Sequence, residues 1–138
     1  MYNEVSVFFE NKPGKLAKLA ELLGTAGIDI LALEVADDGQ FGVFKILTPT
    51  PELAKKALTE ANMTVATTKV ACIEIPDKPG GLLTLARALE EAGLNVTDAY
   101  GCILERGKRA AFVVKGDNLE EIEAAASAAG LKPLDVLP

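Results

Sequence analysis

The sequence predicts an α+β protein that contains one small fold twice. Two observations lead to this prediction: a long internal repeat, and the same order of strand and helix patterns in both copies. The segment NKPGKLAKLAELLGTAGIDI (residues 11–30) returns 66 residues later as DKPGGLLTLARALEEAGLNV (residues 77–96). Nine of the paired positions are identical, and a repeat of this length is one folding unit used twice. We therefore expect two domains, residues 1–68 and 69–138.

The composition is that of a compact protein and argues against several kinds of partner. Of the 138 residues 49% are hydrophobic, but each half alone is near the size at which one core becomes marginal, so the halves should pack together. The net charge is −6 and the 14 Lys and Arg residues are scattered, which disfavours nucleic acid. No apolar stretch approaches the roughly 18 residues of a membrane span, and the polar start MYNE lacks the basic region of a signal peptide. We expect a cytoplasmic protein without a membrane or nucleic-acid partner.

The first strand and helix follow from the start of the chain. Residues 5–9 (VSVFF) are rich in β-forming residues. Asn11 and Pro13 then favour the start of a helix, and Gly27 favours its end. The apolar residues between them recur with helical spacing and are expected to form one core-facing side: Leu16, Leu19, Ala20, Leu23 and Ala26.

The rest of the first half predicts a hairpin, a helix and a closing strand. Residues 28–35 and 41–47 read as strands, and the turn residues 37–40 (DDGQ) between them indicate a hairpin. An Ala-rich helix is expected over residues 51–61. Residues 63–67 then predict the fourth strand.

The second half repeats this plan, with the turn ERGK at residues 105–108 and a two-residue insertion in the strand before it. Its strands are expected at residues 70–75, 94–104, 109–115 and 131–136, and its helices at residues 79–92 and 119–129. Each half is then a ferredoxin-like βαββαβ unit with both helices on one face of an antiparallel sheet. Almost no linker separates Thr67 from Lys69, so the two domains should not swing freely.

The sheet face without helices needs a cover. In the first strand Val5, Val7 and Phe9 alternate toward one side, and Phe8 points to the other. Phe8 and Cys72 are therefore candidates to pack against another sheet or subunit, which favours a homodimer. The alternative is that Phe8 is a single exposed apolar residue of the kind that surfaces tolerate.

The chain carries little equipment for catalysis. Histidine is absent, and no nucleophile elbow, zinc-peptidase helix, P-loop or dinucleotide-binding motif occurs. The pair Asp37 and Asp38 lies in a predicted turn, where solvated Asp residues are common, so a metal site is not expected. Cys72 and Cys102 do not form a C-x-x-C motif and are interpreted as buried free thiols. We expect no enzyme, no cofactor and no metal.

The loops after the first strand of each half are better suited to binding. The patterns Asn11-x-Pro-Gly14 and Asp77-x-Pro-Gly80 place a polar side chain and a residue without Cβ at the start of a helix. The unpaired N–H groups and partial positive charge of a helix N-terminus suit the carboxylate of an amino acid. The alternative is that Asn11 and Asp77 only cap their helices.

These residues carry a family resemblance. A strand, then [Asn/Asp]-x-Pro-Gly, Leu-x-x-Leu-Ala and Ala-Gly-[Ile/Leu]-[Asp/Asn]-[Ile/Val], occurs in both halves and resembles the ACT domain, a small-molecule-sensing module of amino acid metabolism. The resemblance covers nearly the whole chain, as in stand-alone tandem ACT proteins. It implies two units side by side that form one continuous antiparallel sheet of eight strands, and amino acids bound where units meet. It also implies ligand contacts at the first loop and at the opening of the second strand of each half: Asn11 and Asp29, Asp77 and Asn95.

The two halves differ at these positions. The first pairs an amide at Asn11 with a carboxylate at Asp29, and the second pairs Asp77 with Asn95, so the two groups are exchanged. An α-amino acid needs an acceptor for its ammonium and donors for its carboxylate, and each half keeps one carboxylate and one amide. Gly81 replaces Lys15 and removes a cation, which leaves open different affinities or a vestigial second site. The candidate ligand-binding residues are Asn11, Gly14, Lys15, Leu16, Asp29, Asp77, Gly80, Gly81, Leu82 and Asn95.

The resulting hypothesis is a regulatory protein that senses an amino acid at the interface of its ACT units and modulates a partner enzyme of amino acid metabolism. The alternative is a structural or interaction subunit that holds a partner protein on its open sheet face and binds no small ligand.

Overall fold

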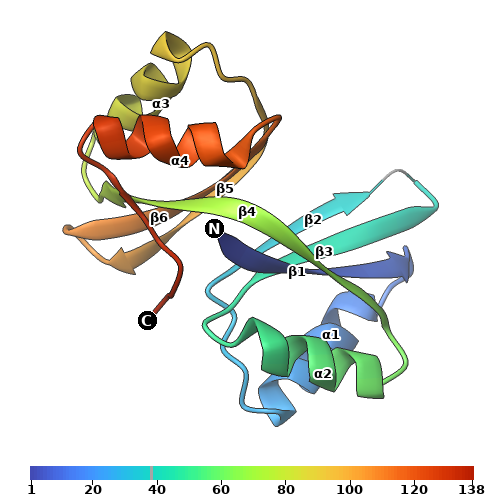
Figure 1. Ribbon diagram of the computed structural model, residues 1–138. Coiled ribbons are helices and arrows are strands. Elements are labelled where there is room, and N and C mark those ends of the chain that lie inside the picture. Colours follow the sequence, from blue (N-terminus) through green and yellow to red (C-terminus); the bar gives the residue numbers. More distant parts are fainter. Residues whose placement is uncertain (38) are drawn as a thin grey trace. The chain divides into compact units, whose positions relative to one another are not determined.

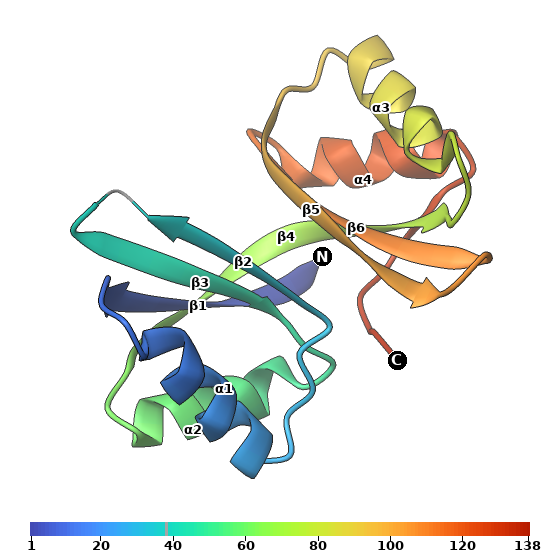
Figure 2. The ribbon, with the colours of Figure 1, turned by 180° about the vertical axis from the view of Figure 1, so that it is seen from behind.

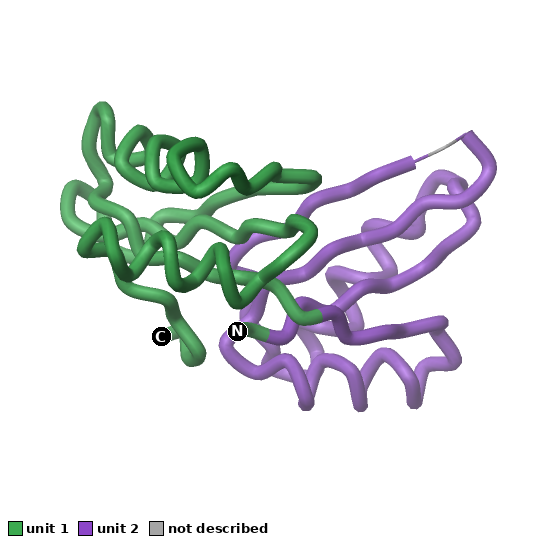
Figure 3. The backbone as a smooth tube through the Cα atoms, turned by 45° about the horizontal axis from the view of Figure 1, so that its top comes forward, with its two compact units in different colours: residues 1–2, 69–138 green, residues 3–68 purple. Residues whose placement is uncertain are grey.

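The computed structural model describes residues 1–37 and 39–138, which form two compact units (Figure 3). We call residues 3–68 the N-terminal unit, and residues 69–138 together with residues 1–2 the C-terminal unit. Within each unit two helices cover one face of a sheet, as Figures 1 and 2 show from opposite sides. The predicted α+β class and the repeated βαββαβ order are confirmed.

The N-terminal unit has the strand order β2-β3-β1-β4. Its elements are β1 (Tyr2–Glu10), α1 (Lys15–Thr25), β2 (Ala32–Asp37), β3 (Phe41–Leu47), α2 (Pro51–Glu60) and the first part of β4 (Thr64–Pro76). The strand β3 pairs antiparallel with both β1 and β2, in a register that places Phe44 between Val7 and Val35. The strand β2 is therefore an edge strand of this sheet, next to β3.

The core of the N-terminal unit lies between the sheet and its helices. It contains Val5, Val7, Leu19, Leu23, Ile28, Phe44, Ile46, Ala54 and Leu58. The ring of Phe9 stacks on that of Phe44 with centroids 4.0 Å apart, so Val5, Val7 and Phe9 share the helix-covered face as predicted. The predicted core face of α1 was too wide, because Leu16 is 49% exposed and Ala20 and Ala26 are exposed.

The C-terminal unit repeats this arrangement with the strand order β5-β6-β4-β7. Its elements are the second part of β4, α3 (Gly81–Glu91), β5 (Val96–Glu105), β6 (Arg109–Gly116), α4 (Leu119–Ala128) and β7 (Lys132–Pro133). Its core contains Ala71, Ile73, Ile75, Leu85, Leu89, Val114, Ile122 and Ala126. In this unit β4 occupies the place that β1 has in the other, which is the arrangement that a repeat predicts.

Several strand boundaries differ from the prediction, and three of these differences have a clear physical reason. The expected strands at residues 63–67 and 70–75 are one strand, β4, because the residues between them, Thr68 and Lys69, are not turn residues. The strand β2 begins at Ala32 rather than at Ile28, whose N–H donates to the carbonyl of Leu23 at 2.9 Å and so closes the end of α1. The last strand is only Lys132–Pro133, and proline cannot donate to a ladder.

The helix starts also shift. The helices α1 and α3 begin at Lys15 and Gly81, two residues after the prolines at which we expected them to start. None of the helices in the described part of the chain is long and apolar enough to cross a membrane.

The helix-free face of the N-terminal sheet carries an exposed apolar cluster, which we call the Phe8 patch: Phe8, Ala36, Phe41 and Val43. The register places Phe8 beside Val43 and Val43 beside Ala36, so these three lie in one row across the sheet. Phe8 is 50% and Phe41 63% exposed, and a hollow of about 350 Å³ lies among them. Phe8 is thus one member of a patch rather than a single exposed residue.

Candidate functional site

The two first loops end in the same way, at a glycine that precedes the helix. Gly14 has φ 91° and Gly80 has φ 84°, a conformation that glycine adopts without strain. These glycines are the N-cap residues of α1 and α3, and no side chain caps either helix. The alternative that Asn11 and Asp77 act as helix caps is therefore wrong.

Asn11 instead connects the first loop to the β2–β3 turn of its own unit. Its side-chain Nδ2 donates to Oδ2 of Asp37, the last residue of β2. Its backbone N–H donates to the carbonyl of Gln40 at 3.2 Å. The other carboxylate oxygen of Asp37 accepts the N–H of Gly39 at 2.8 Å. Loop and turn are thus held together at this end of the N-terminal unit.

Asp77 makes the equivalent connection in the C-terminal unit. Its Oδ2 accepts the N–H of Gly107 at 2.6 Å, and its own N–H donates to the carbonyl of Lys108 at 3.2 Å. Lys108 also pairs with Glu105 across the turn, with 2.8 Å between Nζ and Oε1. We call the Asn11–Asp37–Gly39 contacts and the Asp77–Gly107 contact the two latches.

The latches explain the exchange of amide and carboxylate between the halves. In both units a carboxylate accepts the N–H of the turn glycine, from Asp37 within the turn in one and from Asp77 in the loop in the other. Where the carboxylate is in the turn, the loop supplies the amide of Asn11 to hold it. The exchange therefore has a structural reason within each unit, independent of any ligand.

The residues around the helix starts differ between the units. Lys15 is half-buried and opens α1, whereas Gly81 is buried and opens α3. Leu16 and Leu82, the next residues, are both exposed, at 49% and 44%. Each helix start therefore offers an apolar side chain to solvent beside its N–H groups.

Asp29 and Asn95 lie away from these loops in their own units. Asp29 is exposed in the connection between α1 and β2, and Asn95 is exposed just before β5. The N–H of Leu31 donates to Leu47, so Asp29 is near the end of β3 that is opposite to its start beside Asn11. The helix α1 runs from one of these ends to the other. Its length therefore places Asn11 and Asp29 about 15 Å or more apart. Neither unit by itself brings its two predicted contacts together.

The sequence reasoning missed Asp37 and Gly107 as partners of the first loop. Both turns carry glycine at the third position, as DDGQ and ERGK, and this shared position was the available signal. Asp38, the other half of the acidic pair, lies outside the described residues. Within residues 1–37 and 39–138 no three Cys, Asp or Glu side chains gather in a way that could hold a metal ion.

Both cysteines are free thiols in the C-terminal unit, but Cys102 is only partly buried, so the interpretation of both as buried is wrong for Cys102. Cys72 is buried in β4, and burial together with the nearby Cys102 raises the pKa of its thiol to about 12. Burial also raises the pKa of the Cys102 thiol. Neither has the depressed pKa of a reactive cysteine.

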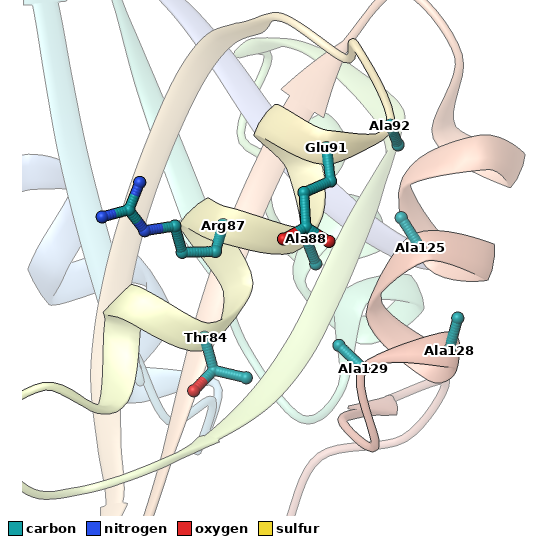
Figure 4. A pocket seen from close by; sticks show the side chains of 8 residues that line it. All are labelled: Thr84, Arg87, Ala88, Glu91, Ala92, Ala125, Ala128 and Ala129. Atoms are coloured by element: carbon teal, nitrogen blue, oxygen red, sulfur yellow. The ribbon is translucent and has the colours of Figure 1, made fainter.

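A groove of about 500 Å³ separates α3 from α4 in the C-terminal unit (Figure 4). Five alanines line it, together with the polar side chains Thr84, Arg87 and Glu91 of α3. The alanines are Ala88, Ala92, Ala125, Ala128 and Ala129. Figure 4 shows Arg87 turned away from the alanines of α4, and its Nη1 donates to Glu90 at 3.0 Å. The repeat places Leu22 where α3 has Ala88, so one large apolar side chain of the N-terminal unit is a small one in this groove. It contains none of the predicted site residues.

The comparisons with known proteins agree with the resemblance of both halves. The sequence matches the ACT domain pair family over residues 1–131. It matches none of the curated proteins with which it was compared. Protein BT0572 from Bacteroides thetaiotaomicron is 26% identical, with 96% of this chain and 91% of that chain covered and a TM-score of 0.85. The ligand-free regulatory subunit of aspartate kinase from Thermus thermophilus is 16% identical, with 92% and 91% covered and a TM-score of 0.62, which shows a common fold.

The family match extends over both units and includes every predicted site residue. It confirms the resemblance that the two Pro-Gly loops indicated. The chain belongs to the family of ACT domain pairs, a regulatory module.

Proposed function

We propose that this protein is a cytoplasmic regulator that senses an amino acid through its ACT units and modulates an enzyme of amino acid metabolism. The match to the ACT domain pair family is the observation that supports the proposal most, because an ACT domain pair is a regulatory module. The regulatory subunit of aspartate kinase from Thermus thermophilus has the same fold over nearly its whole length, which supports a metabolic enzyme as the partner.

The proposed contacts are those of the first loops and of the residues that precede the second strands. The helix N-termini behind Gly14 and Gly80 are capped by no side chain, and N–H groups at such an end suit the carboxylate of an amino acid. Asp29 and Asn95 are exposed and supply an acceptor and an amide for the ammonium group or a polar side chain.

Since one unit keeps Asn11 and Asp29 apart, we propose that two copies of the chain complete the site. The strand β2 is an edge strand, with Asn11 beside its last residue and Asp29 before its first. If the β2 edges of two copies pair antiparallel, the Asn11 end of one meets the Asp29 end of the other. In this proposed homodimer the ligand would be bound where the two copies meet.

The first test is a thermal shift measurement against the twenty amino acids. A ligand that binds only the native state raises the free energy of unfolding by mass action, by about 2.7 kcal/mol at a ligand concentration of a hundred times Kd. The melting temperature rises as a consequence. We expect at least one amino acid to raise the melting temperature. A flat response to all twenty would leave the interaction-subunit alternative as the better account.

The second test locates the ligand with Asp29→Ala and Asn95→Ala, which remove no latch. Loss of a charge-assisted hydrogen bond should weaken binding by about 1.5 to 3 kcal/mol, or roughly tenfold to a hundredfold, in titration calorimetry. Asp117→Ala is the control, because Asp117 is exposed and lies before α4. Unchanged affinity in both test variants would remove the proposed contacts.

The alternative function retains one specific observation in its favour. The Phe8 patch exposes two aromatic side chains beside a hollow of about 350 Å³, and such patches mark protein contact surfaces. Under this alternative the patch holds a partner protein, no amino acid raises the melting temperature, and substitutions in the patch abolish binding of the partner.

A further inference from the structure

We propose that a hollow at the end of β4 in the C-terminal unit binds a small organic anion, one with a carboxylate and a short aliphatic part. The hollow has a volume of about 190 Å³. Its lining comes from the last residues of β4, from Lys108 in the β5–β6 turn, and from residues 130–132, which connect α4 to β7. It contains none of the residues proposed to contact the amino acid.

Two lysines bring positive charge to the hollow. Lys132 is exposed and stands opposite Glu74 in the register of β7 and β4, but with the residues that the structure describes its ammonium group forms no ion pair. Lys108 is exposed and pairs with Glu105 at 2.8 Å, a surface contact that contributes little and can open. Glu105 and the nearby Asp77 do not line the hollow. Both ammonium groups can therefore turn to an anion.

The one carboxylate in the lining is already neutralised. Oε1 of Glu74 accepts hydrogen bonds from Nε and Nη2 of Arg109, at 2.9 and 2.6 Å. Because the side chain of Glu74 is only 25% exposed, this ion pair is partly shielded from water. Arg109 thus takes the carboxylate that would otherwise pair with Lys132, and the charge of Lys132 is left for a ligand.

The hollow also has an apolar part, which sets the size and shape of the ligand. Ile75 and Leu131 line it, and both pack in the core of the unit, which fixes their positions. The volume corresponds to about six water molecules at about 30 Å³ each, or to a ligand with about as many non-hydrogen atoms. Butyrate has this size, with one charged end and one aliphatic end.

The internal repeat shows that the fold does not require these charges. Gln40 and Thr64 occupy the positions of the two lysines in the N-terminal unit, and Phe8 occupies the position of Glu74. That unit has the same arrangement of strands and helices without a charge at any of the three positions. The charges are therefore a property of this hollow.

Backbone amide chemical shifts during a titration of the full chain with sodium butyrate, at constant ionic strength, test for the site. We expect saturable shifts for the amides of three residues of the hollow: Ile75, Leu131 and Lys132. The equivalent amides of the N-terminal unit are the control and should not shift: Phe9, Met63 and Thr64. No saturable shift at the hollow, or equal shifts in both units, would overturn the proposal.

Butyramide separates the contribution of the carboxylate from that of the aliphatic part, because it has nearly the same shape and no charge. We expect butyramide to bind at least about fivefold more weakly than butyrate, since it forms no charge-assisted hydrogen bond with a lysine. Equal affinities would mean that the apolar lining alone binds, which would overturn the assignment of an anion.

Three substitutions identify the groups that hold the anion. Lys132→Met should weaken butyrate binding about fivefold or more, whereas Lys132→Arg should retain it. Glu74→Gln should strengthen binding about threefold or more, because it frees the guanidinium of Arg109. Lys55→Met is the charge-matched control, because Lys55 is exposed on α2. Unchanged affinity in Lys132→Met, or weaker binding in Glu74→Gln, would overturn the proposal.

The butyrate titration and the thermal shift test with amino acids can fail separately. A protein that an amino acid stabilises and that binds no butyrate would keep the proposed function and lose this site. A protein that binds butyrate in the hollow and responds to no amino acid would keep the site and lose the proposed function.

Discussion

The side-chain amide of Asn11 donates a hydrogen bond to the carboxylate of Asp37, which lies 26 residues further along the chain. This contact joins the first loop to the tip of the β2–β3 hairpin within one unit. A loop residue that looks like a helix cap in the sequence therefore has a tertiary role. Any movement of the loop on ligand binding must be accommodated by the end of the edge strand β2.

The first prediction concerns this latch. Asn11→Ala and Asp37→Ala should each lower the free energy of unfolding by about 0.5 to 1.5 kcal/mol, since each removes one partner of an exposed hydrogen bond. The double variant should lose less free energy of unfolding than the sum of the two single variants, because both substitutions remove the same Asn11–Asp37 hydrogen bond. Urea unfolding of the three variants and the wild type gives the coupling energy. Strict additivity would mean that Asn11 and Asp37 act independently.

The second prediction concerns the glycine at the start of α3. Gly81→Ala should destabilise the protein by about 1 to 3 kcal/mol, because the added Cβ would lie 2.1 Å from a backbone oxygen that cannot easily move. Gly24→Ala in α1 is the matched control, since a Cβ there meets nothing within 4 Å. The control should be neutral or stabilising by up to about 1 kcal/mol. Equal melting temperatures for the two variants would contradict the close packing at Gly81.

The third prediction is a loss of stability in alkali. Burial is the main cause that raises the pKa of Cys72 from 9.0 to about 12, and it also raises the pKa of Tyr2 from 10.0 to about 12. Between pH 9 and 12 the unfolded chain releases these protons and the folded chain keeps them. The free energy of unfolding should therefore be level below pH 9 and fall, on the order of a few kcal/mol, as the pH rises toward 12.

Urea unfolding at a series of pH values measures this fall. Cys72→Ala is the informative variant, because it removes the larger of the two pKa shifts and should flatten the curve from pH 9 upward. An unchanged slope in this variant would assign the alkaline transition to other groups.

The fourth prediction concerns the Phe8 patch and the proposed homodimer. The Phe8 patch reaches β2 through Ala36, so we expect it to extend the contact of the paired β2 edges. Phe8→Ser should then shift the protein from dimer toward monomer in sedimentation at micromolar concentration, because it removes a large apolar side chain from the patch. Leu53→Ser is the control, since Leu53 is 58% exposed but lies on α2. A wild-type protein that sediments only as a monomer would contradict the homodimer. A Leu53→Ser variant that dissociates instead would place the contact on the helices.

The order of elements could be predicted because each depends on local pattern. The strand β3 was expected at residues 41–47 and occupies Phe41–Leu47, since the turn before it and the helix after it both carry strong sequence signals. The start of β2 could not be predicted, because Ile28 suits a strand by type but is used to close α1. The choice depends on a backbone hydrogen bond that composition does not reveal.

The candidate site was predictable only as far as the repeat could show it. The two Pro-Gly loops and their capping glycines are visible in the sequence, because the same pattern occurs twice. The partner of Asn11 is not visible, since Asp37 becomes its neighbour only when β2 and β3 form their hairpin. For the same reason the sequence could not show that Asp29 lies at the far end of its unit.

The strand β4 is covalently shared by the two units, since its residues up to Thr68 belong to one and those from Lys69 to the other. A cut in this strand on either side of the bond between Thr68 and Lys69 therefore removes strand residues from one unit and leaves them on the other. Unfolding of either unit also withdraws support from the strand that the other one uses. The two copies of the repeat are thus joined within a strand rather than by a linker, and we expect the two units to unfold together.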